Sequence, residues 1–320
     1  MQHGIDRREH LTGDGAMYRI PWLCSTALAA WLAAGFAGET QAQERTIPNF
    51  TSANFGWLVN TGFDYRPVEG TVAPIGADSN WRGGIGLPTS DFNHQPPEAA
   101  ADPRRQGPSR IGPWNIERLS DVENPNLTPW AAAQMRMHNE LVSKGRRAFS
   151  AMSRCWPGGP AQLLFNAEPL YFIQTPQEVW ILWQRDHLVR RVFLNREHRG
   201  NLKPSWFGES VGHYENGQLI VDTISFVEHP YSFLDNWRTP HTKDLHMVER
   251  WKLLDGGNAI EATVTFDDHG AFNAPWSGMV RWSKMNGPIL ESVCAENNEN
   301  YQNILGLSEY PMPEAKASDF

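Results

Sequence analysis

In the second half of the chain, short apolar runs alternate with turn residues at a spacing typical of β-hairpins. The runs rich in β-branched and aromatic residues are 179–184, 189–194, 210–215, 219–226, 259–266 and 278–283. ENGQ (215–218) and LDGGN (254–258) stand between neighbouring runs, and both favour tight turns. No alternation of strands with helices is visible, so the pattern predicts a mostly antiparallel sheet. Six or more strands in about 110 residues indicate a β-barrel or a β-sandwich.

The segment from 128 to 143, TPWAAAQMRMHNELVS, carries the start and stop signals of a helix. Thr128 is a preferred N-cap residue, Pro129 fits the first helical position, and Gly145 follows just past the end. The stretch from 43 to 126 contains many Pro and Gly residues and little periodicity. We therefore expect residues 43–126 to form an extended arm around the core, with one short strand near 55–59. Residues 127–320 are expected to form the helix and the β-barrel.

Acidic residues outnumber basic residues by 36 to 28, which gives a formal net charge of −8. No block of consecutive Lys or Arg is present that could follow a phosphate backbone, so the sequence argues against a nucleic-acid-binding protein. The sequence leaves the oligomeric state open.

The first 42 residues have the pattern of a leader followed by a secretory signal peptide. One Arg precedes an apolar stretch from 20 to 36, and small residues lead to Ala42, the expected cleavage site. Met17 is then the expected start, and residues 1–16 precede it. The alternative is a single transmembrane anchor, but the stretch is short and is interrupted by Ser25 and Thr26. We expect a periplasmic or secreted protein without a stable membrane anchor after cleavage.

Export changes what the cysteines indicate. Cys24 leaves with the signal peptide, so Cys155 and Cys294 remain in an oxidising compartment. An even pair predicts a disulfide between them, and two free buried thiols are the alternative.

The segment LHMVERW, 245–251, allows two interpretations that lead to different chemistry. As a strand, it places Glu249 in an apolar row and points His246 and Arg250 to the opposite face. As a helix beginning after Thr239, it would bring His246 and Glu249 to one face, where they would share a metal ion. The turn LDGGN leads directly into the next apolar run and favours the strand. We therefore expect no metal site and no other cofactor.

The segment QLIVDTISF, 218–226, similarly places Asp222 among apolar residues if it is a strand. A carboxylate on an apolar face must be paired, hydrogen-bonded or protonated, because an isolated buried charge costs several kcal/mol. Asp222 and Glu249 are therefore candidates for acid–base chemistry. A structural ion pair with Arg190 or Arg191 is the alternative.

His241 lies on the expected loop before the strand at 245–251, and Asp235 precedes it on the same connection. A carboxylate beside an imidazole fixes its tautomer and supports its charged form, so the pair is a candidate general base. An exposed surface histidine is the alternative. In FDDHG, 266–270, Asp268 is a candidate for ligand contact or a turn former.

Several usual signatures are absent from the sequence. It contains no GxSxG nucleophile elbow, no phosphate-binding GK[ST] loop, no dinucleotide fingerprint and no HExxH motif. A cysteine nucleophile is not expected if Cys155 and Cys294 are paired.

Taken together, several motifs resemble an uncharacterised family of secreted bacterial proteins. The matching segments are LTPWA (127–131), CWPGGP (155–160), IQTPQEVWIL (173–182), GESVGHYENGQLIVDT (208–223), FLDNWRTPHTKDLHMVERW (233–251), FDDHGAFNAPW (266–276) and CAENNENYQNIL (294–305). The resemblance implies export, a lipocalin-like barrel, and a polar cluster formed by Asp222, Asp235, His241, His246, Glu249 and Arg250. Asp268-His269 stands where the family has Asp-Pro, and Arg238 stands where the family has Gly, so these loops are expected to differ.

The strand pattern predicts a mainly β, antiparallel fold, and the resemblance implies that it is a lipocalin-like barrel. We expect its cavity to hold a small apolar or aromatic molecule. The first hypothesis is a cofactor-free lyase, isomerase or hydrolase in which Asp235 orients His241 as the base and Glu249 or Asp222 is the acid. Arg250 would stabilise developing negative charge.

The remaining site residues are expected to contact the ligand, and they are His246, Asp268 and Trp276. The second hypothesis is a non-catalytic protein that uses the same cavity for binding or transport. A mononuclear metalloenzyme is the third.

Overall fold

The computed structural model of the chain describes residues 47–60, 64–76, 119–143, 155–166, 168–294 and 316. All of them belong to one compact unit, Gln43–Phe320. The expected signal peptide and Gly145 lie outside the described residues. No helix among the described residues is long and apolar enough to cross a membrane.

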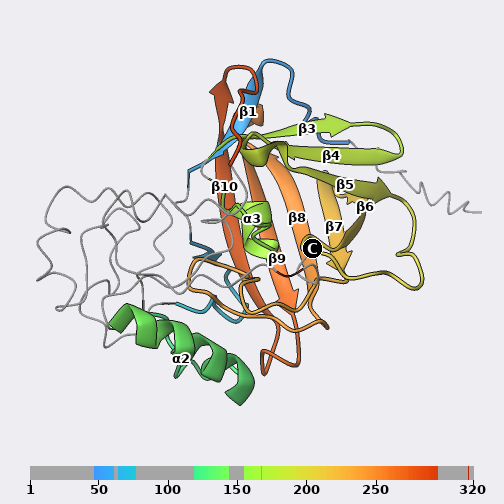
Figure 1. Ribbon diagram of the computed structural model, residues 1–320. Helices are drawn as coiled ribbons and strands as arrows, with labels where there is room; N and C mark the ends of the chain where they lie inside the picture. The colour runs from blue at the N-terminus through green and yellow to red at the C-terminus, as the bar shows by residue number, and fades with distance from the viewer. Residues whose placement is uncertain are drawn as a thin grey trace, which may run out of the picture. The chain divides into compact units, whose positions relative to one another are not determined.

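Nine strands form a closed β-barrel, and a tenth strand pairs with it at one edge (Figure 1). The strands are β1 (Phe55–Val59), β2 (Arg66–Pro67), β3 (Leu170–Gln174), β4 (Glu178–Trp183), β5 (Val189–Leu194), β6 (Glu209–Glu215), β7 (Gln218–Ile224), β8 (His246–Leu254), β9 (Ala259–Asp267) and β10 (Trp276–Asn286). Neighbours follow the order β1-β3-β4-β5-β6-β7-β8-β9-β10, and β1 also pairs with β10. The mainly β barrel expected from the sequence is confirmed.

The two tight turns explain the hairpins that join β6 to β7 and β8 to β9. Asn216 and Gly217 at the tip of the first have φ of 49° and 72°, the left-handed conformation that Asn and Gly tolerate best. A short 3-10 turn at Asp255–Gly257 makes the second connection.

One pair of strands departs from the antiparallel rule. β5 and β6 run parallel, with Val192 opposite Ser210. A parallel pair requires a crossover of about a dozen residues, and the 195–208 loop supplies it without a helix. Because that loop contains no helical pattern, nothing in the local sequence indicated the change of direction.

The N-terminal arm contributes one strand, β1, to the barrel itself. The predicted strand at 55–59 is present as β1, which pairs with β10 along its length and meets β3 at Trp57–Leu170. In Figure 1, β1 in blue lies beside β10, which comes from the other end of the described chain. Closure therefore depends on the arm.

Large side chains fill the barrel. Alternate residues of each strand point inward, as the two-residue period requires. The fully buried aromatic residues in this core include Trp57, Phe172, Trp183, Trp251, Phe266, Trp276 and Trp282. Trp251 stacks on Trp282 with ring centroids 4.9 Å apart. The cavity of the candidate site is lined by residues of α2 and of the β7–β8 connection, and none of its described lining residues belongs to a strand.

Two α-helices in the described part of the chain accompany the barrel. Helix α2 (Pro129–Ser143) matches the predicted helix. Its N-cap is confirmed, because Thr128 Oγ1 accepts a hydrogen bond from the backbone N–H of Ala131 at 3.3 Å. Ala131 and Met135 on this helix join the hydrophobic core. The short helix α3 (Pro160–Leu164), which the sequence analysis missed, is completely buried.

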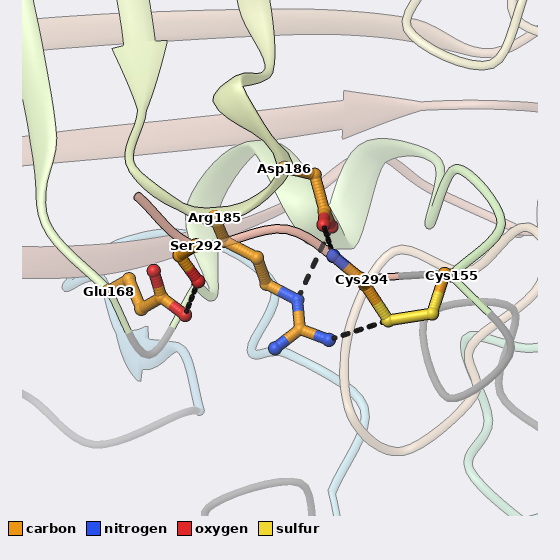
Figure 2. Close-up of a disulfide and its surroundings, with 6 residues drawn as sticks. All are labelled: Cys155, Glu168, Arg185, Asp186, Ser292 and Cys294. Atoms are coloured by element: carbon orange, nitrogen blue, oxygen red, sulfur yellow. Dashed lines mark hydrogen bonds and ion pairs between the residues drawn. A yellow bond between two sulfur atoms is a disulfide. The ribbon is translucent and has the colours of Figure 1, made fainter. Parts of the chain in front are cut away.

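The predicted disulfide between Cys155 and Cys294 is present, with Cα atoms 5.4 Å apart (Figure 2). The disulfide holds the segment that follows β10 close to the connection between β4 and β5. Asp186 at that corner accepts a hydrogen bond from the Cys294 backbone N–H at 2.7 Å, and Arg185 donates to Cys294 Sγ at 3.7 Å. The bridge thus closes a loop that spans 139 positions of sequence.

Candidate functional site

A cavity of about 150 Å³ lies between helix α2 and the connection from β7 to β8. The helix contributes Trp130, Gln134 and His138, which share one face because they are spaced four residues apart. The other wall comes from the connection, which runs from 225 to 245. Its lining residues are Glu228, His229, Pro230, Phe233, Arg238, Pro240 and His241.

His241, a predicted site residue, is part of this wall and is held at both ring nitrogens. Its Nδ1 lies 2.9 Å from the carbonyl oxygen of Thr242, and its Nε2 lies 2.7 Å from Ser232 Oγ. A carbonyl oxygen only accepts, so Nδ1 carries the proton and Nε2 is the acceptor for the serine hydroxyl. This is the hydrogen-bond arrangement of a serine beside its general base.

Burial also favours the neutral form of this imidazole. It lowers the pKa of His241 below 6.5, although the bond to the Thr242 carbonyl and the charges of Asp268 and Glu228 raise it. His241 is only 2% exposed, so the surface-histidine alternative is wrong. A neutral imidazole with an acceptor at Nε2 is able to take a proton.

Ser232 was missed in the sequence because no nucleophile motif surrounds it. It is 1% exposed, and its backbone N–H donates to the carbonyl oxygen of His229 at 2.9 Å. Gly159 packs against it with φ of 65°, and a Cβ at that position would collide with Ser232 Oγ. The CWPGGP segment therefore supplies a glycine that leaves room for the Ser232 hydroxyl.

The structure contradicts the prediction that Asp235 orients His241. The Asp235 carboxylate instead accepts hydrogen bonds from the backbone N–H groups of Trp237 and Thr239, at 2.9 and 3.1 Å, and from Thr239 Oγ1 at 2.8 Å. Complete burial raises its pKa to about 6 in spite of these three donors. Short-range hydrogen bonds to its own loop occupy the carboxylate, which sequence spacing did not reveal.

The positioning role falls to Asp268 instead. Its carboxylate accepts hydrogen bonds from the backbone N–H and the Oγ1 of Thr242, at 2.6 and 2.8 Å, and from the backbone N–H of Gly270 at 3.0 Å. Thr242 is thereby fixed, and its carbonyl oxygen holds His241. Asp268 therefore combines a turn-forming role with support for the site.

Helix α2 adds His138, which the sequence analysis also missed. It is 3% exposed, and its Nδ1 is buried with no hydrogen-bond partner among the described residues. Burial and then the charge of Arg238 lower its pKa to about 3, against a smaller opposite effect of a hydrogen bond to the backbone of Pro230. Because amphipathic helices bury such residues routinely, the sequence gave no signal that this histidine faces a cavity.

Glu249 lies in the barrel interior, where the ion-pair alternative is confirmed. Arg190 from β5 donates to both of its carboxylate oxygens, with Nη1 3.0 Å from Oε1. Arg190 also donates to Ser210 Oγ at 2.9 Å and to Thr223 Oγ1 at 2.8 Å. The predicted strand orientation of Glu249 is confirmed, but its carboxylate is occupied and lies away from the lining of the cavity.

Asp222 is on the outer surface of the barrel, contrary to the buried apolar face that the sequence suggested. It pairs with His246 Nε2 at 2.9 Å and with His198 Nε2 at 2.9 Å. In QLIVDTI both faces of the strand are apolar, so the sequence did not decide which one points inward. The register does, because Val221 rather than Asp222 stands opposite the inward-pointing Glu249.

The other predicted residues are also apart from the cavity. Arg250 is exposed on the outer face of β8, while Trp276 is fully buried and packs against Phe266 at 4.5 Å between ring centroids. The strand sends His246 and Glu249 to opposite faces, so the shared-metal alternative for these two residues is wrong. Within the described parts of the chain, no group of three or more His, Cys, Asp or Glu side chains is arranged to hold a metal ion.

Comparison with known proteins finds no matching family model, no matching characterised protein and no matching solved structure.

Proposed function

We propose that the protein is an exported, cofactor-independent acid–base enzyme that hydrolyses a small substrate bound between α2 and the β7–β8 connection. One observation carries this proposal. The Ser232 hydroxyl lies 2.7 Å from the acceptor nitrogen of His241, which lines the cavity, and the Thr242 carbonyl fixes the required tautomer.

The chemistry follows from that geometry. His241 Nε2 takes the proton as Ser232 Oγ forms a bond to the carbonyl carbon of an ester, and the bond from that carbon to the leaving oxygen breaks. The leaving alcohol departs with the proton from His241. Water then attacks the acyl carbon and gives its proton to His241. The bond from that carbon to Ser232 Oγ breaks, His241 returns the proton to Oγ, and the acid and the free serine are released.

The cavity limits the substrate. A volume of about 150 Å³ is the size of a cavity that binds a single benzene ring. Trp130 and Phe233 supply apolar wall, while Arg238, His138 and His241 supply polar groups. This combination suits a small molecule with one ring and one or two polar substituents.

A non-catalytic binding protein is the second candidate, and the burial of Ser232 favours it. A hydroxyl that is 1% exposed must become accessible before it attacks a substrate. Both nitrogens of His241 are already hydrogen-bonded. The Ser232–His241 pair therefore also fits a structural role, in which it holds the wall of the cavity in place.

The decisive experiment is hydrolysis of 4-nitrophenyl acetate, combined with mass spectrometry after treatment with a fluorophosphonate probe. The native protein is expected to release nitrophenol and to carry the probe on Ser232. Ser232→Ala should lose both signals, and His241→Gln should lose them while its amide still accepts the serine hydrogen bond. If the native protein shows neither turnover nor labelling, the proposed hydrolase activity is wrong and the binding function is the remaining candidate.

Export is part of the proposal and rests on separate observations. The Cys155–Cys294 disulfide supports an oxidising compartment, and so does the resemblance to secreted bacterial proteins. Mass spectrometry of the protein from its host tests export directly, because an intact segment 20–36 in the mature chain would contradict it.

A further inference from the structure

The crossover loop, residues 195–208, joins the parallel strands β5 and β6 and carries His198. We propose that this loop is a pH-sensitive element controlled by His198. The charged imidazole holds the loop to β6 and to β7, and the neutral imidazole holds it to only one of them. Because the loop also contacts the wall of the cavity, the wall loosens with it. The proposal goes beyond the proposed function and does not depend on hydrolysis.

The first step is the position of His198 between two carboxylates. Its Nδ1 lies 3.2 Å from Glu209 Oε2 on β6, and its Nε2 lies 2.9 Å from Asp222 Oδ1 on β7. The side chain of His198 is 19% exposed and that of Glu209 is 5% exposed, so little water reaches the contact between them. One imidazole ring therefore holds the crossover loop to two neighbouring strands.

The second step is the ionisation of these carboxylates. Burial raises the pKa of Glu209, but hydrogen bonds from Arg199 and His198 outweigh burial and lower it below its ordinary value. Burial also raises the pKa of Asp222, and hydrogen bonds from His246 and His198 outweigh burial there. Both carboxylates are therefore ionised at neutral pH, and an ionised carboxylate only accepts hydrogen bonds.

The third step concerns the protons of the ring. A neutral imidazole has one N–H group, whereas an imidazolium has two. His198 therefore donates to both carboxylates only when it is charged, and in the neutral ring one nitrogen turns its lone pair toward a carboxylate oxygen. Histidine is the side chain that ordinarily changes its charge between about pH 5 and pH 8. The contribution of the second hydrogen bond is thus present at acidic pH and is lost as the pH rises.

The fourth step accounts for the other groups that face this cluster. The charged or titratable groups packed beside His198, Glu209 and Asp222 are Arg196 and Arg199 on the loop, His246 on β8 and Asp267 on β9. The two arginines donate to Glu209 and stay charged across this range. His246 donates to the other oxygen of Asp222 at 2.9 Å and does not belong to the loop. Only a change at His198 therefore alters how the loop is held.

The fifth step links the crossover loop to the cavity. The backbone N–H of Ser205 donates to the carbonyl oxygen of Ser225 at 3.1 Å, and its carbonyl oxygen accepts from the N–H of Val227 at 2.9 Å. The ring centroid of Trp206 lies 4.9 Å from that of His229, which lines the cavity. Loosening of the loop therefore removes support from the cavity wall at 225–229.

The test is hydrogen–deuterium exchange of the full-length protein, followed by mass spectrometry, without any substrate. Exchange is compared at about pH 5.5 and about pH 8.5, on either side of the ordinary histidine range, and is expressed relative to the intrinsic rate at each pH. Protection of peptides from 195–208 and 225–229 is expected to be about fivefold lower at the higher pH. Peptides from β10 report any change in global stability and should keep their protection.

Three substitutions separate His198 from other groups. His198→Gln has no charge to gain and donates to only one of the carboxylates, so the loop should have low protection at both pH values. Asp222→Asn provides an amide that donates to the neutral ring, so protection should persist at the higher pH. His213→Gln on β6 is the control, because this histidine is 51% exposed and pairs with Glu215, and the pH dependence should remain.

Each contrary outcome has a definite meaning. Equal protection of the loop at both pH values in the native protein would overturn the role of His198. A pH dependence that persists in His198→Gln would overturn it as well, because another group would then be responsible. A loop that loosens while residues 225–229 keep their protection would overturn the link to the cavity. The fluorophosphonate experiment tests hydrolysis separately, so failure of either proposal is recognised without the other.

Discussion

Glu249 on β8 and Arg190 on β5 face each other inside the barrel, where Arg190 donates to both oxygens of the Glu249 carboxylate. Neither side chain is more than 3% exposed. Ser210 and Thr223 accept further hydrogen bonds from the guanidinium, so the group forms a satisfied network within an otherwise apolar core. Removing one charge from such a pair leaves the other buried without compensation.

Glu249→Gln is therefore expected to destabilise the fold by about 3 to 5 kcal/mol, because Arg190 keeps its charge and loses its counter-ion. Urea unfolding measures the change. Glu178→Gln is the matched control, since it breaks the solvent-exposed pair with Arg191 and should have a far smaller effect. Equal effects of the two substitutions would contradict the structural role of the buried pair.

Loss of the disulfide is expected to cost about 3 to 5 kcal/mol, because it releases a loop spanning 139 positions of sequence in the unfolded chain. The measurement compares urea unfolding of the native protein with that of the Cys155→Ser, Cys294→Ser double variant. Peptide mapping without reduction should also recover the linked pair. Alkylation of both cysteines in native, unreduced protein would show that the bridge is absent.

The outer pair of Asp222 and His246 predicts a pH dependence. Burial raises the pKa of Asp222, but the hydrogen bonds from His246 and His198 outweigh burial and lower it. The bond to Asp222 raises the pKa of His246 above 6.5. The histidine contribution to stability is then full below pH 6.5 and is lost as the pH rises through the raised pKa. The aspartate contribution is full above pH 3.8 and is lost as the pH falls through the lowered pKa.

Asp222→Asn should return the His246 pKa toward its ordinary value, which NMR titration of the histidine ring detects. Because both side chains are more than a third exposed, the expected loss of stability is below about 1 kcal/mol. An unchanged titration of His246 in the variant would show that Asp222 does not control it.

Ionisation of Asp235 predicts that the free energy of unfolding falls as the pH rises, which is the opposite of the trend expected from Asp222. Its pKa is raised to about 6, so the folded protein binds this proton more tightly than the unfolded chain does. Stability should fall by up to about 3 kcal/mol as the pH rises from 3.8 through 6. Asp235→Asn removes the ionisation, so that part of the pH dependence should disappear from urea unfolding. A variant with the same pH profile as the native protein would contradict this assignment.

Gly159→Ala tests whether the Ser232 hydroxyl needs the space beside Gly159 in order to react and to hydrogen-bond with His241. Both Gly159 and Gly217 have positive φ, 65° and 72°, so alanine strains the backbone at either position. Only at Gly159 would the added Cβ meet Ser232, because nothing lies within 4 Å of a Cβ at Gly217. Gly159→Ala should lose fluorophosphonate labelling and Gly217→Ala should keep it. Full labelling of both variants would mean that Ser232 does not need this space.

The sequence by itself determined the elements formed by local patterns. The two-residue alternation placed most strands, and the Thr128-Pro129 pair marked the start of α2. The same alternation pointed Glu249 into the barrel, and the even number of cysteines that the expected export would leave predicted the disulfide. The strands, the start of α2 and the orientation of Glu249 depend on periods and residue types that are complete within a short stretch of chain, whereas the disulfide was predicted from the number of cysteines alone.

Tertiary structure alone decided the rest, because it depends on register and on which distant segments meet. QLIVDTI is apolar on both faces, so only its pairing with β8 showed that Asp222 points outward. Asp235 and His241 are close in sequence, yet local hydrogen bonds hold the first and Ser232 holds the second. His138 reaches the same cavity from α2, about a hundred positions away in sequence, because packing of that helix against the β7–β8 connection buries both.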